Sequence, residues 1–481
     1  MREDLLNNDL FGNQAGEDED KERLNDYYLE KEQNARFFDK GTKLSFVRAR
    51  KGVGKSALLN YTAYKVEEKY PEDIIINIKA SELFSLIECD EKNYLLNINC
   101  WQQRICSRVL NEIAKMINFA CDDDSMRIVE HSEITGFKGK DILTALIDRL
   151  KIKGSVVEKN QTDESVFNSY EVLKRFSSKQ NKCVWLFIDD IDATFKNVED
   201  NKIIVGSFFT ACRYLTNDVN GLNIRASVRT DVWTILKNFD ESLDKCEQYM
   251  LDLSWSTRDT GEILYNKIYS YFKHKDKNIG EKNYSDTEEQ KRIFNYLFTK
   301  YLLWGGNKVN PYRVIHILSA GRPRWAAQLC KLAALDAYNK GKDKIASGNI
   351  NFAMNEYGKY RMADLLKEHS HQCDKIESIT GIFRNGERKY RTNSLLYLVD
   401  SKIIKQGIDI YIDGDNQPCD EKQICKFLYR IGFITLRTDE YNKALGLTRF
   451  EDDPYMFSES NIDDSQIWEI HPAYRTVLQI K

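Results

Sequence analysis

Short apolar runs alternate with longer amphipathic segments over the first half of this 481-residue chain. The runs lie at 44–47, 73–78, 184–188, 224–228 and 249–253. Apolar residues recur at helical spacing in 55–69, 94–118, 141–151, 169–177, 202–216 and 231–239. Continuous apolar runs are typical of strands buried on both faces, so their alternation with helices predicts a parallel sheet flanked by helices, an α/β fold.

The pattern changes along the chain and divides it into parts. Residues 1–40 are polar and acidic and form a lead-in to the first strand, with an amphipathic helix expected over 24–38. The α/β core spans 41–255 and contains a polar, irregular stretch at 119–165, which we interpret as an insertion. From 256 to 380 the strand signals fade and helical periodicity continues, which predicts a helical lid domain.

The last part of the chain, 381–481, has a third pattern. Helices are expected at 393–406 and 419–431, and strands at 433–437 and 466–470. An acidic, turn-rich stretch joins the two strands. Two helices followed by a strand, a loop and a strand is the order of elements in a winged helix.

Composition narrows the class of protein. The net charge is −3, but 256–380 carries 21 basic and 14 acidic residues, an excess that suits either nucleic acid or a solvated helical surface. No apolar run approaches the ~20 residues that span a bilayer, and the N-terminus does not resemble a signal peptide. Eleven scattered cysteines without a Cys-x-x-Cys pair are typical of a cytoplasmic protein. We therefore expect a cytoplasmic protein with no membrane partner.

A glycine-containing loop follows the first apolar run and precedes a helical segment, in the sequence Ala49-Arg-Lys-Gly-Val-Gly-Lys-Ser56. Gly52 and Gly54 let backbone amides approach phosphate oxygens, and Lys55 would reach the β- and γ-phosphates. Ser56 would bind Mg²⁺. The expected nucleotide-binding residues at this loop are Lys51, Gly52, Val53, Gly54, Lys55, Ser56 and Ala57. Ala49 stands where this motif usually has glycine, so we expect an altered entry to the loop.

A second motif supplies carboxylates. The apolar run at 184–188 ends in Asp189 and Asp190, with Asp192 two residues further on. Asp189 is placed to hold Mg²⁺, and Asp190 is placed to orient or deprotonate an attacking water. Asp192 is interpreted as a supporting or capping group. The alternative is that these acids only cap the helix that follows.

These motifs together resemble those of the P-loop ATPases that include the AAA+ origin-recognition initiators and the STAND signalling ATPases. In detail the chain resembles a bacterial family of such ATPases that carries a C-terminal winged helix. The resemblance extends over residues 11–474, and it does not cover 119–165. It implies an ATP-binding core, a helical lid and a winged-helix tail.

The resemblance also gives roles to three arginines. Arg229 ends the run at 224–228 and resembles the STAND arginine that detects the γ-phosphate; the alternative is a pair with Asp231 or Asp189. Arg324 is similar in position to the second sensor of the initiators, and Arg322 competes with it for that role. The segment Gly321-x-Pro323 resembles the STAND lid motif. Surface salt bridges are the alternative for Arg322 and Arg324.

The predicted tail helix at 419–431 has one basic face. Lys422, Lys426 and Arg430 recur every four residues and so share a face, while the apolar residues between them would point to the core. This face could contact DNA phosphates, or it could simply be solvated.

The sequence therefore predicts an ATP-binding and ATP-hydrolysing molecular switch that uses Mg²⁺. In this hypothesis Asp190, Lys55, Arg229 and Arg324 act in catalysis, and the protein is DNA-associated, in genome maintenance or defence against foreign DNA. The alternative is a STAND-like signalling ATPase that oligomerises on sensing a protein ligand without binding DNA. Partners would be a second copy of the chain or an effector protein. Hydrolysis can also require an arginine from a neighbouring subunit; the sequence does not assign this residue, and Arg213 is only a guess for it.

Overall fold

The computed structural model describes residues 2–13, 16, 18–84, 93–116, 128, 132, 168–179, 182–193, 195–275, 287–438, 446–458 and 460–480. Its chain contacts divide it into two compact units. The first unit contains Met1–Leu29, Lys51–Gly54 and Ser254–Lys481, and the second contains Glu30–Arg50 and Lys55–Leu253. The predicted helix at 141–151 lies outside the described residues, as does nearly all of the predicted insertion at 119–165.

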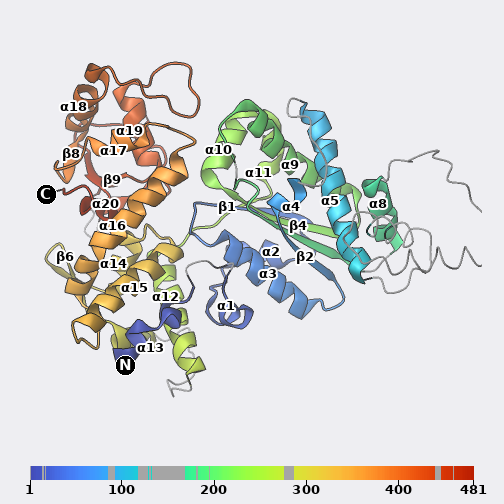
Figure 1. Cartoon of the computed structure of the whole chain (residues 1–481), viewed down its shortest axis with the longest axis horizontal. Coiled ribbons are helices and arrows are strands. Elements are labelled where there is room, and N and C mark those ends of the chain that lie inside the picture. Colours follow the sequence, from blue (N-terminus) through green and yellow to red (C-terminus); the bar gives the residue numbers. More distant parts are fainter. Residues whose placement is uncertain are drawn as a thin grey trace, which may run out of the picture. The chain divides into compact units, whose positions relative to one another are not determined.

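A five-stranded sheet forms the centre of the second unit, in the order β2-β3-β4-β1-β5 (Figure 1). Its strands are β1 (Leu44–Ala49), β2 (Ile74–Lys79), β3 (Val184–Asp189), β4 (Leu222–Arg229) and β5 (Met250–Asp252). All four strand pairings are parallel. Each predicted apolar run coincides with one of these strands, so the predicted α/β fold is confirmed.

Helices cover this sheet on both faces. In Figure 1, α3 lies on one side of the strands, and α9 and α10 lie on the other. The helices of this unit are α2 (Ala35–Phe38), α3 (Lys55–Lys69), α4 (Ala80–Phe84), α5 (Tyr94–Met116), α8 (Ser169–Lys179), α9 (Glu199–Asp218), α10 (Thr230–Phe239) and α11 (Asp244–Glu247), with 3₁₀ turns η3 (Glu32–Asn34) and η4 (Glu241–Leu243). The rings of Phe46 on β1, Phe209 on α9 and Trp233 on α10 pack edge to face, with centroids 5.0 and 4.9 Å apart. These apolar contacts hold the helical layer against the strand that leads into the phosphate loop.

The first unit is mainly helical between residues 254 and 380. Its elements there are α12 (Thr257–His274), α13 (Thr287–Leu297), the hairpin of β6 (Leu302–Trp304) and β7 (Asn307–Val309), α14 (Pro311–Leu318), α15 (Pro323–Asn339), α16 (Ser347–His369) and α17 (Ile376–Gly381). Three N-terminal elements, η1 (Arg2–Leu6), η2 (Asn8–Phe11) and α1 (Lys21–Tyr27), pack against α12 and α15. Ser256 and Asp259 form a capping box that fixes the start of α12.

The end of the first unit is a small helix-and-sheet module, which we call the C-terminal module (residues 381–480). It contains β8 (Lys389–Arg391), α18 (Thr392–Lys402), η5 (Ile404–Gln406), α19 (Glu421–Arg430), β9 (Ile434–Arg437), β10 (Leu447–Thr448), β11 (Ile467–Ile470) and α20 (Pro472–Arg475). The strands form an antiparallel sheet in the order β10-β9-β11-β8. The strands predicted at 433–437 and 466–470 are β9 and β11, while β8 and β10 were not predicted.

The prediction of one amphipathic helix over 24–38 is wrong. Helix α1 ends at Tyr27, the backbone of Tyr28 is extended, and helical structure resumes only with η3 and α2. Tyr28 packs edge-on against Trp255 with ring centroids 6.4 Å apart, a contact that the extended turn provides. The boundary between the two compact units also falls here, after Leu29. A continuous apolar stripe in the sequence therefore serves two separate cores.

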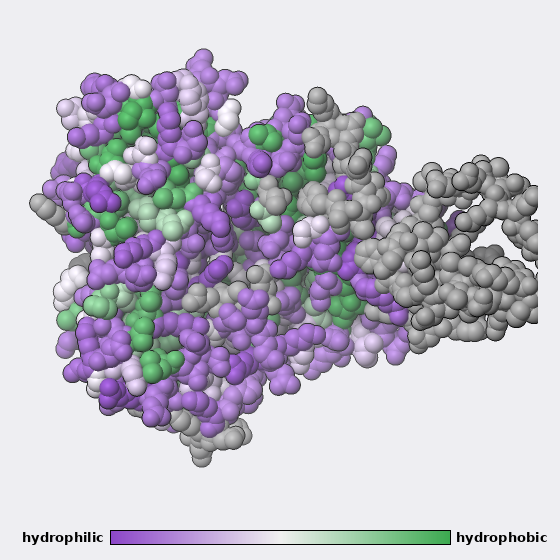
Figure 2. All heavy atoms as spheres, in the orientation of Figure 1, coloured by the Kyte–Doolittle hydropathy of each residue, from purple (hydrophilic) through white to green (hydrophobic). Residues whose placement is uncertain are grey.

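Polar side chains predominate on the face shown in Figure 2, with apolar side chains in small groups among them. Of the helices that the structure describes, none is both long enough and apolar enough to cross a lipid bilayer.

Candidate nucleotide-binding site

The phosphate loop connects the end of β1 to the start of α3. Strand β1 ends at Ala49, and α3 begins at Lys55. Gly52 and Gly54 have φ angles of 80° and 114°, which side-chain-bearing residues rarely adopt. The Lys55 ammonium group donates to the Ala49 carbonyl over 3.3 Å, so the side chain folds back along the loop. Both glycines therefore have backbone conformations that favour a residue without a side chain.

The acidic pair lies at the carboxyl edge of the same sheet. β3 ends at Asp189, and its neighbour β4 contributes Ser227, whose hydroxyl donates to Asp189 Oδ1. The Asp190 amide donates to that same carboxylate oxygen over 3.0 Å. Because β1, β3 and β4 are parallel, the start of α3 and both aspartates belong to one edge of the sheet. The two donors hold the Asp189 carboxylate in a fixed orientation.

Asp190 itself has a left-handed backbone, with φ of 59°. Aspartate is one of the few residues with a side chain that tolerates this region. The conformation turns the chain sharply after β3, and the Ala193 amide closes the turn on the Asp190 carbonyl over 3.0 Å.

Arg229 ends β4 and is paired with Asp192. Its Nε lies 2.8 Å from Asp192 Oδ2, and its backbone amide donates to the same oxygen over 2.9 Å. Asp231 is further away, at 3.9 Å, and Asp192 is only 2% exposed. Asp192 is therefore a close partner of this arginine, with Asp231 at a longer distance; Asp231 and Asp189 were the alternatives considered from the sequence. Asp192 acts as a supporting group that connects the turn after β3 to the end of β4.

The first unit places Arg322 and Arg324 differently. Arg322 is 4% exposed, and one of its terminal nitrogens lies 2.9 Å from Glu368 on α16 and 3.2 Å from the Lys51 carbonyl. Burial is the largest single effect and lowers the pKa of Arg322, but Glu368, Tyr474 and Glu451 together hold the pKa above its usual value. Arg324 is exposed, and its backbone amide donates to the Gly52 carbonyl over 3.3 Å. The surface salt bridge considered for Arg322 is thus replaced by a buried one.

Two predicted surface positions also have partners. Arg430 on α19 lies 2.6 Å from Asp413 and stacks over the Phe427 ring at 5.1 Å, which leaves Lys422 and Lys426 as the exposed lysines of that face. Ile424, Phe427 and Leu428 are buried in the C-terminal module, as predicted. Arg213 is partly exposed on α9 and stacks over Tyr214 at 5.5 Å.

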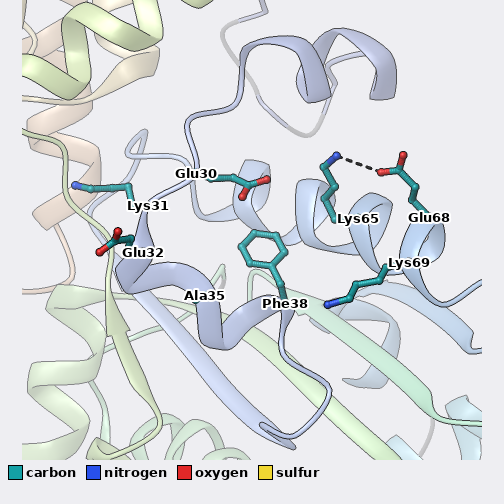
Figure 3. Close-up of a pocket in the computed structure, with 8 residues that line it drawn as sticks. All are labelled: Glu30, Lys31, Glu32, Ala35, Phe38, Lys65, Glu68 and Lys69. Atoms are coloured by element: carbon teal, nitrogen blue, oxygen red, sulfur yellow. Dashed lines mark hydrogen bonds and ion pairs between the residues drawn. The ribbon is translucent and has the colours of Figure 1, made fainter. Parts of the chain in front are cut away.

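The second unit also contains a groove that lies apart from the phosphate loop. It measures about 570 Å³ and is lined by Glu30, Lys31, Glu32, Ala35, Phe38, Lys65, Glu68 and Lys69 (Figure 3). Lys65 is paired with Glu68 at 3.1 Å. Lys65 lies ten residues after Lys55 on α3, or ~15 Å along the helix at 1.5 Å per residue. This groove therefore belongs to the later turns of α3 and not to its phosphate-binding end.

The sequence did not reveal several residues that shape the site. Ser227 orients Asp189, Glu368 pairs with Arg322, and the Trp255 indole donates to the Val53 carbonyl over 2.7 Å. None of them belongs to a recognisable motif, and Glu368 lies 46 residues from its partner. For Ser227, its place in the strand that follows the acidic pair in the sequence could have indicated a role beside Asp189.

The residues present fit a magnesium–nucleotide group. The left-handed glycines, the lysine at the start of α3 and the oriented carboxylate of Asp189 are the donor and acceptor types that a triphosphate and its Mg²⁺ require. With the parallel sheet, this loop defines an α/β P-loop NTPase fold.

Comparisons with known proteins add little to this assignment. No protein-family model matches the chain. The chain is similar to the "Putative transposon gamma-delta 80.3 kDa protein" of Escherichia coli (strain K12), with 25% identity over 155 residues, or 32% of this chain. The match covers 22% of that relative, so the chain spans only about a fifth of the relative's length.

Solved structures with a similar arrangement have low scores. The ORC2 protein of Aeropyrum pernix has a TM-score of 0.38 and 12% identity, covering 90% of this chain and 85% of its own. The ORC1 protein of the same organism, in complex with DNA, has a TM-score of 0.36 and 11% identity over 94% of this chain and 93% of its own. The RuvB Holliday junction branch migration motor of Thermotoga maritima has a TM-score of 0.33 and 13% identity, with 86% of both chains covered. At these scores the likeness carries no argument about activity, and the fold assignment depends on the strand order and loop of the chain itself.

Proposed function

We propose that this protein is an ATP-binding and ATP-hydrolysing switch of the AAA+ and STAND-like group. One observation supports this most strongly: Lys55, which follows the glycine loop in the chain and begins α3, and the paired aspartates share one edge of a parallel sheet. This is the arrangement that phosphoryl transfer needs, because its catalysis depends mainly on positioning and electrostatic stabilisation.

The proposed roles follow from residue type and position. Amides of residues 52–57 and the Lys55 ammonium group would bind the phosphates, and Ser56 and Asp189 would hold Mg²⁺, which neutralises phosphate charge when bound. Asp190 would accept a hydrogen bond from the attacking water and act as general base. Arg229 would contribute through its pair with Asp192, and the exposed side chain of Arg324 is the candidate to reach a phosphate.

Steady-state ATP turnover tests this proposal. Lys55→Ala removes a positive charge that would stabilise the transition state, and Asp190→Asn removes the proposed general base. Each substitution should lower kcat at least about 100-fold. Lys65→Ala on the same helix and Asp244→Asn at the exposed start of α11 are the controls and should keep wild-type rates. Wild-type turnover in both site variants would refute the proposed site.

The C-terminal module is proposed to be a winged helix that contacts DNA. Its support is the exposed pair Lys422 and Lys426 on α19, one helical turn apart. The Lys422→Glu/Lys426→Glu double variant should weaken binding to a DNA duplex and reduce its salt dependence, while Lys359→Glu on α16 should change neither.

The alternative remains a STAND-like switch that assembles on a protein ligand. Nucleotide-dependent assembly of wild-type chains, measured by light scattering, without any affinity for DNA would favour it over DNA association. In that case the two lysines belong to a solvated surface.

A further inference from the structure

Three consecutive carbonyl groups of the phosphate loop accept hydrogen bonds within the first unit. The Lys51 carbonyl accepts from the Arg322 guanidinium at 3.2 Å, and the Gly52 carbonyl accepts from the Arg324 amide at 3.3 Å. The Val53 carbonyl accepts from the Trp255 indole at 2.7 Å. The donors come from the start of α15 and from the segment before α12, and all of these residues belong to the same compact unit.

The orientation of these carbonyls fixes the orientation of the amides that would bind phosphate. A peptide unit is planar and trans, so each carbonyl points opposite to the N–H group of the next residue. Holding the carbonyls of Lys51, Gly52 and Val53 therefore directs the N–H groups of Gly52, Val53 and Gly54 away from Arg322, Arg324 and Trp255. Neighbouring N–H groups that converge on one side of a loop can form an anion-binding nest.

Close packing reinforces this arrangement. A Cβ atom added to Gly52 would lie 3.3 Å from Cβ of Arg324, on a backbone whose φ of 80° already disfavours a side chain. Trp255 is 5% exposed and packs against Tyr28, so its indole has little freedom to turn. The loop therefore lies directly against its donors.

Arg322 extends the contact beyond the loop. The same nitrogen that donates to the Lys51 carbonyl also donates to Glu368, whose side chain is 1% exposed, near the end of α16. The Arg322 guanidinium stacks over the Trp325 ring at 4.0 Å, which restricts its movement. A change in the position of α16 would therefore act on the loop through one guanidinium group.

We propose that Trp255 and Arg322 are positioning residues for the phosphate loop, and that Arg322 couples the loop to Glu368 and so to the helix that leads into the C-terminal module. The inference rests on the proposed nucleotide-binding function. It adds the residues through which nucleotide binding and the position of the end of α16 would influence one another. Neither residue needs to touch the nucleotide, because both act through the direction of backbone amides.

Binding of a fluorescent N-methylanthraniloyl derivative of ATP, in MgCl₂, tests the role of Trp255. Trp255→Phe removes the indole N–H but keeps an aromatic ring, and it should weaken affinity about fivefold, the equivalent of one hydrogen bond. The matched control is Trp468→Phe, which loses the indole bond to Thr392 at 3.0 Å in the C-terminal module and should stay within about twofold of wild type. The change in tryptophan emission on adding unlabelled ATP should shrink in Trp255→Phe and persist in Trp468→Phe.

The coupling is tested with Glu368→Gln, which leaves a hydrogen-bond acceptor but removes the charge that holds Arg322. It should raise the KM for ATP about threefold or more with little change in kcat. Glu469→Gln, at a carboxylate 3% exposed and paired with Arg475 at 2.6 Å, matches it in burial and should change neither constant.

The outcomes separate this inference from the proposed function. If wild type binds the nucleotide and Lys55→Ala does not, but Trp255→Phe and Glu368→Gln bind like wild type, the positioning role is refuted and the nucleotide site stands. If wild type shows no binding, the proposed function is refuted and the inference with it. If the two tryptophan variants, or the two glutamine variants, lose affinity equally, the effect is general instability and the positioning role is refuted.

Discussion

Two buried arginines, one in each compact unit, hold neighbouring chain segments by different chemistry. Arg225 on β4 is fully buried and stacks over Trp185 at 4.9 Å. Its guanidinium donates to the backbone carbonyls of Arg36, Phe37, Asp39, Thr42 and Ile224. Arg322 instead pairs with a buried carboxylate and donates to only one carbonyl.

The electrostatic consequences differ accordingly. Burial lowers the pKa of Arg225 to about 9, since its carbonyl partners are neutral, whereas Glu368 and the nearby Tyr474 and Glu451 together keep the pKa of Arg322 above its ordinary value. Arg225 fastens the segment before β1 to the sheet, and the carbonyls to which it donates lie before β1 and on β4, outside the phosphate loop. Arg322 contacts the phosphate loop itself. The comparison teaches that burial alone does not identify an arginine with a role at the site. The location of its hydrogen-bond and ion-pair partners is the better guide.

Removing Arg322 should have the largest effect on stability. Arg322→Ala breaks the buried ion pair with Glu368 and should lower the free energy of unfolding by about 3–5 kcal/mol. Urea unfolding followed by circular dichroism measures this loss. Arg258→Ala, at a pair whose arginine is 84% exposed, is the control and should cost less than about 0.5 kcal/mol. A loss below about 1 kcal/mol for Arg322→Ala would show that the ion pair does not contribute substantially to the stability of the fold.

Removing Arg225 should affect stability without affecting nucleotide affinity. Arg225→Met keeps an apolar stem but leaves buried carbonyls without a donor, which should cost about 2–3 kcal/mol. Nucleotide titration of the folded variant should give a Kd within about twofold of wild type. An affinity loss as large as that of Arg322→Ala would remove the distinction between the two arginines.

Acid should destabilise the first unit through two buried histidines. Burial lowers the pKa of His316 to about 4 and that of His471 to about 3. Below pH 6.5 the unfolded chain binds protons that the folded chain does not, so stability falls as pH decreases toward these values. Each histidine should cost about 2 kcal/mol at pH 5 relative to pH 7. Unfolding of wild type and His316→Gln at both pH values measures this, and equal pH dependence in the two would contradict the assignment to His316.

The smallest effect is expected at Ser227. Ser227→Ala removes one donor to Asp189 and should raise the Mg²⁺ concentration needed for half-maximal ATP turnover by about threefold to tenfold, equivalent to about 1 kcal/mol. Turnover assayed across a magnesium series shows the shift. Ser242→Ala, near the surface in η4, is the control. An unchanged magnesium requirement would mean that the Ser227 hydroxyl does not orient the carboxylate.

The sequence allowed much of the second unit to be predicted, because its strands are continuous apolar runs that are buried on both faces. The phosphate loop and the Asp189–Asp190 pair were also predictable, since their chemistry depends on residues adjacent in the chain. Arg322 and Glu368 are 46 residues apart, and Arg229 lies closer to Asp192, 37 residues away, than to Asp231, two residues away in the sequence. Such pairs depend on tertiary packing, which local periodicity does not encode. The break after Tyr27 was missed for the same reason, because two cores share one apolar stripe.

The most direct test of the account is a calorimetric titration of the purified chain with the slowly hydrolysed analogue ATPγS in MgCl₂. The account predicts saturable one-to-one binding by wild type, weakened at least about tenfold in Lys55→Ala, and unchanged in Lys65→Ala. No binding by wild type, or equal binding by wild type and Lys55→Ala, would contradict the claim that the loop after β1 holds a nucleoside triphosphate.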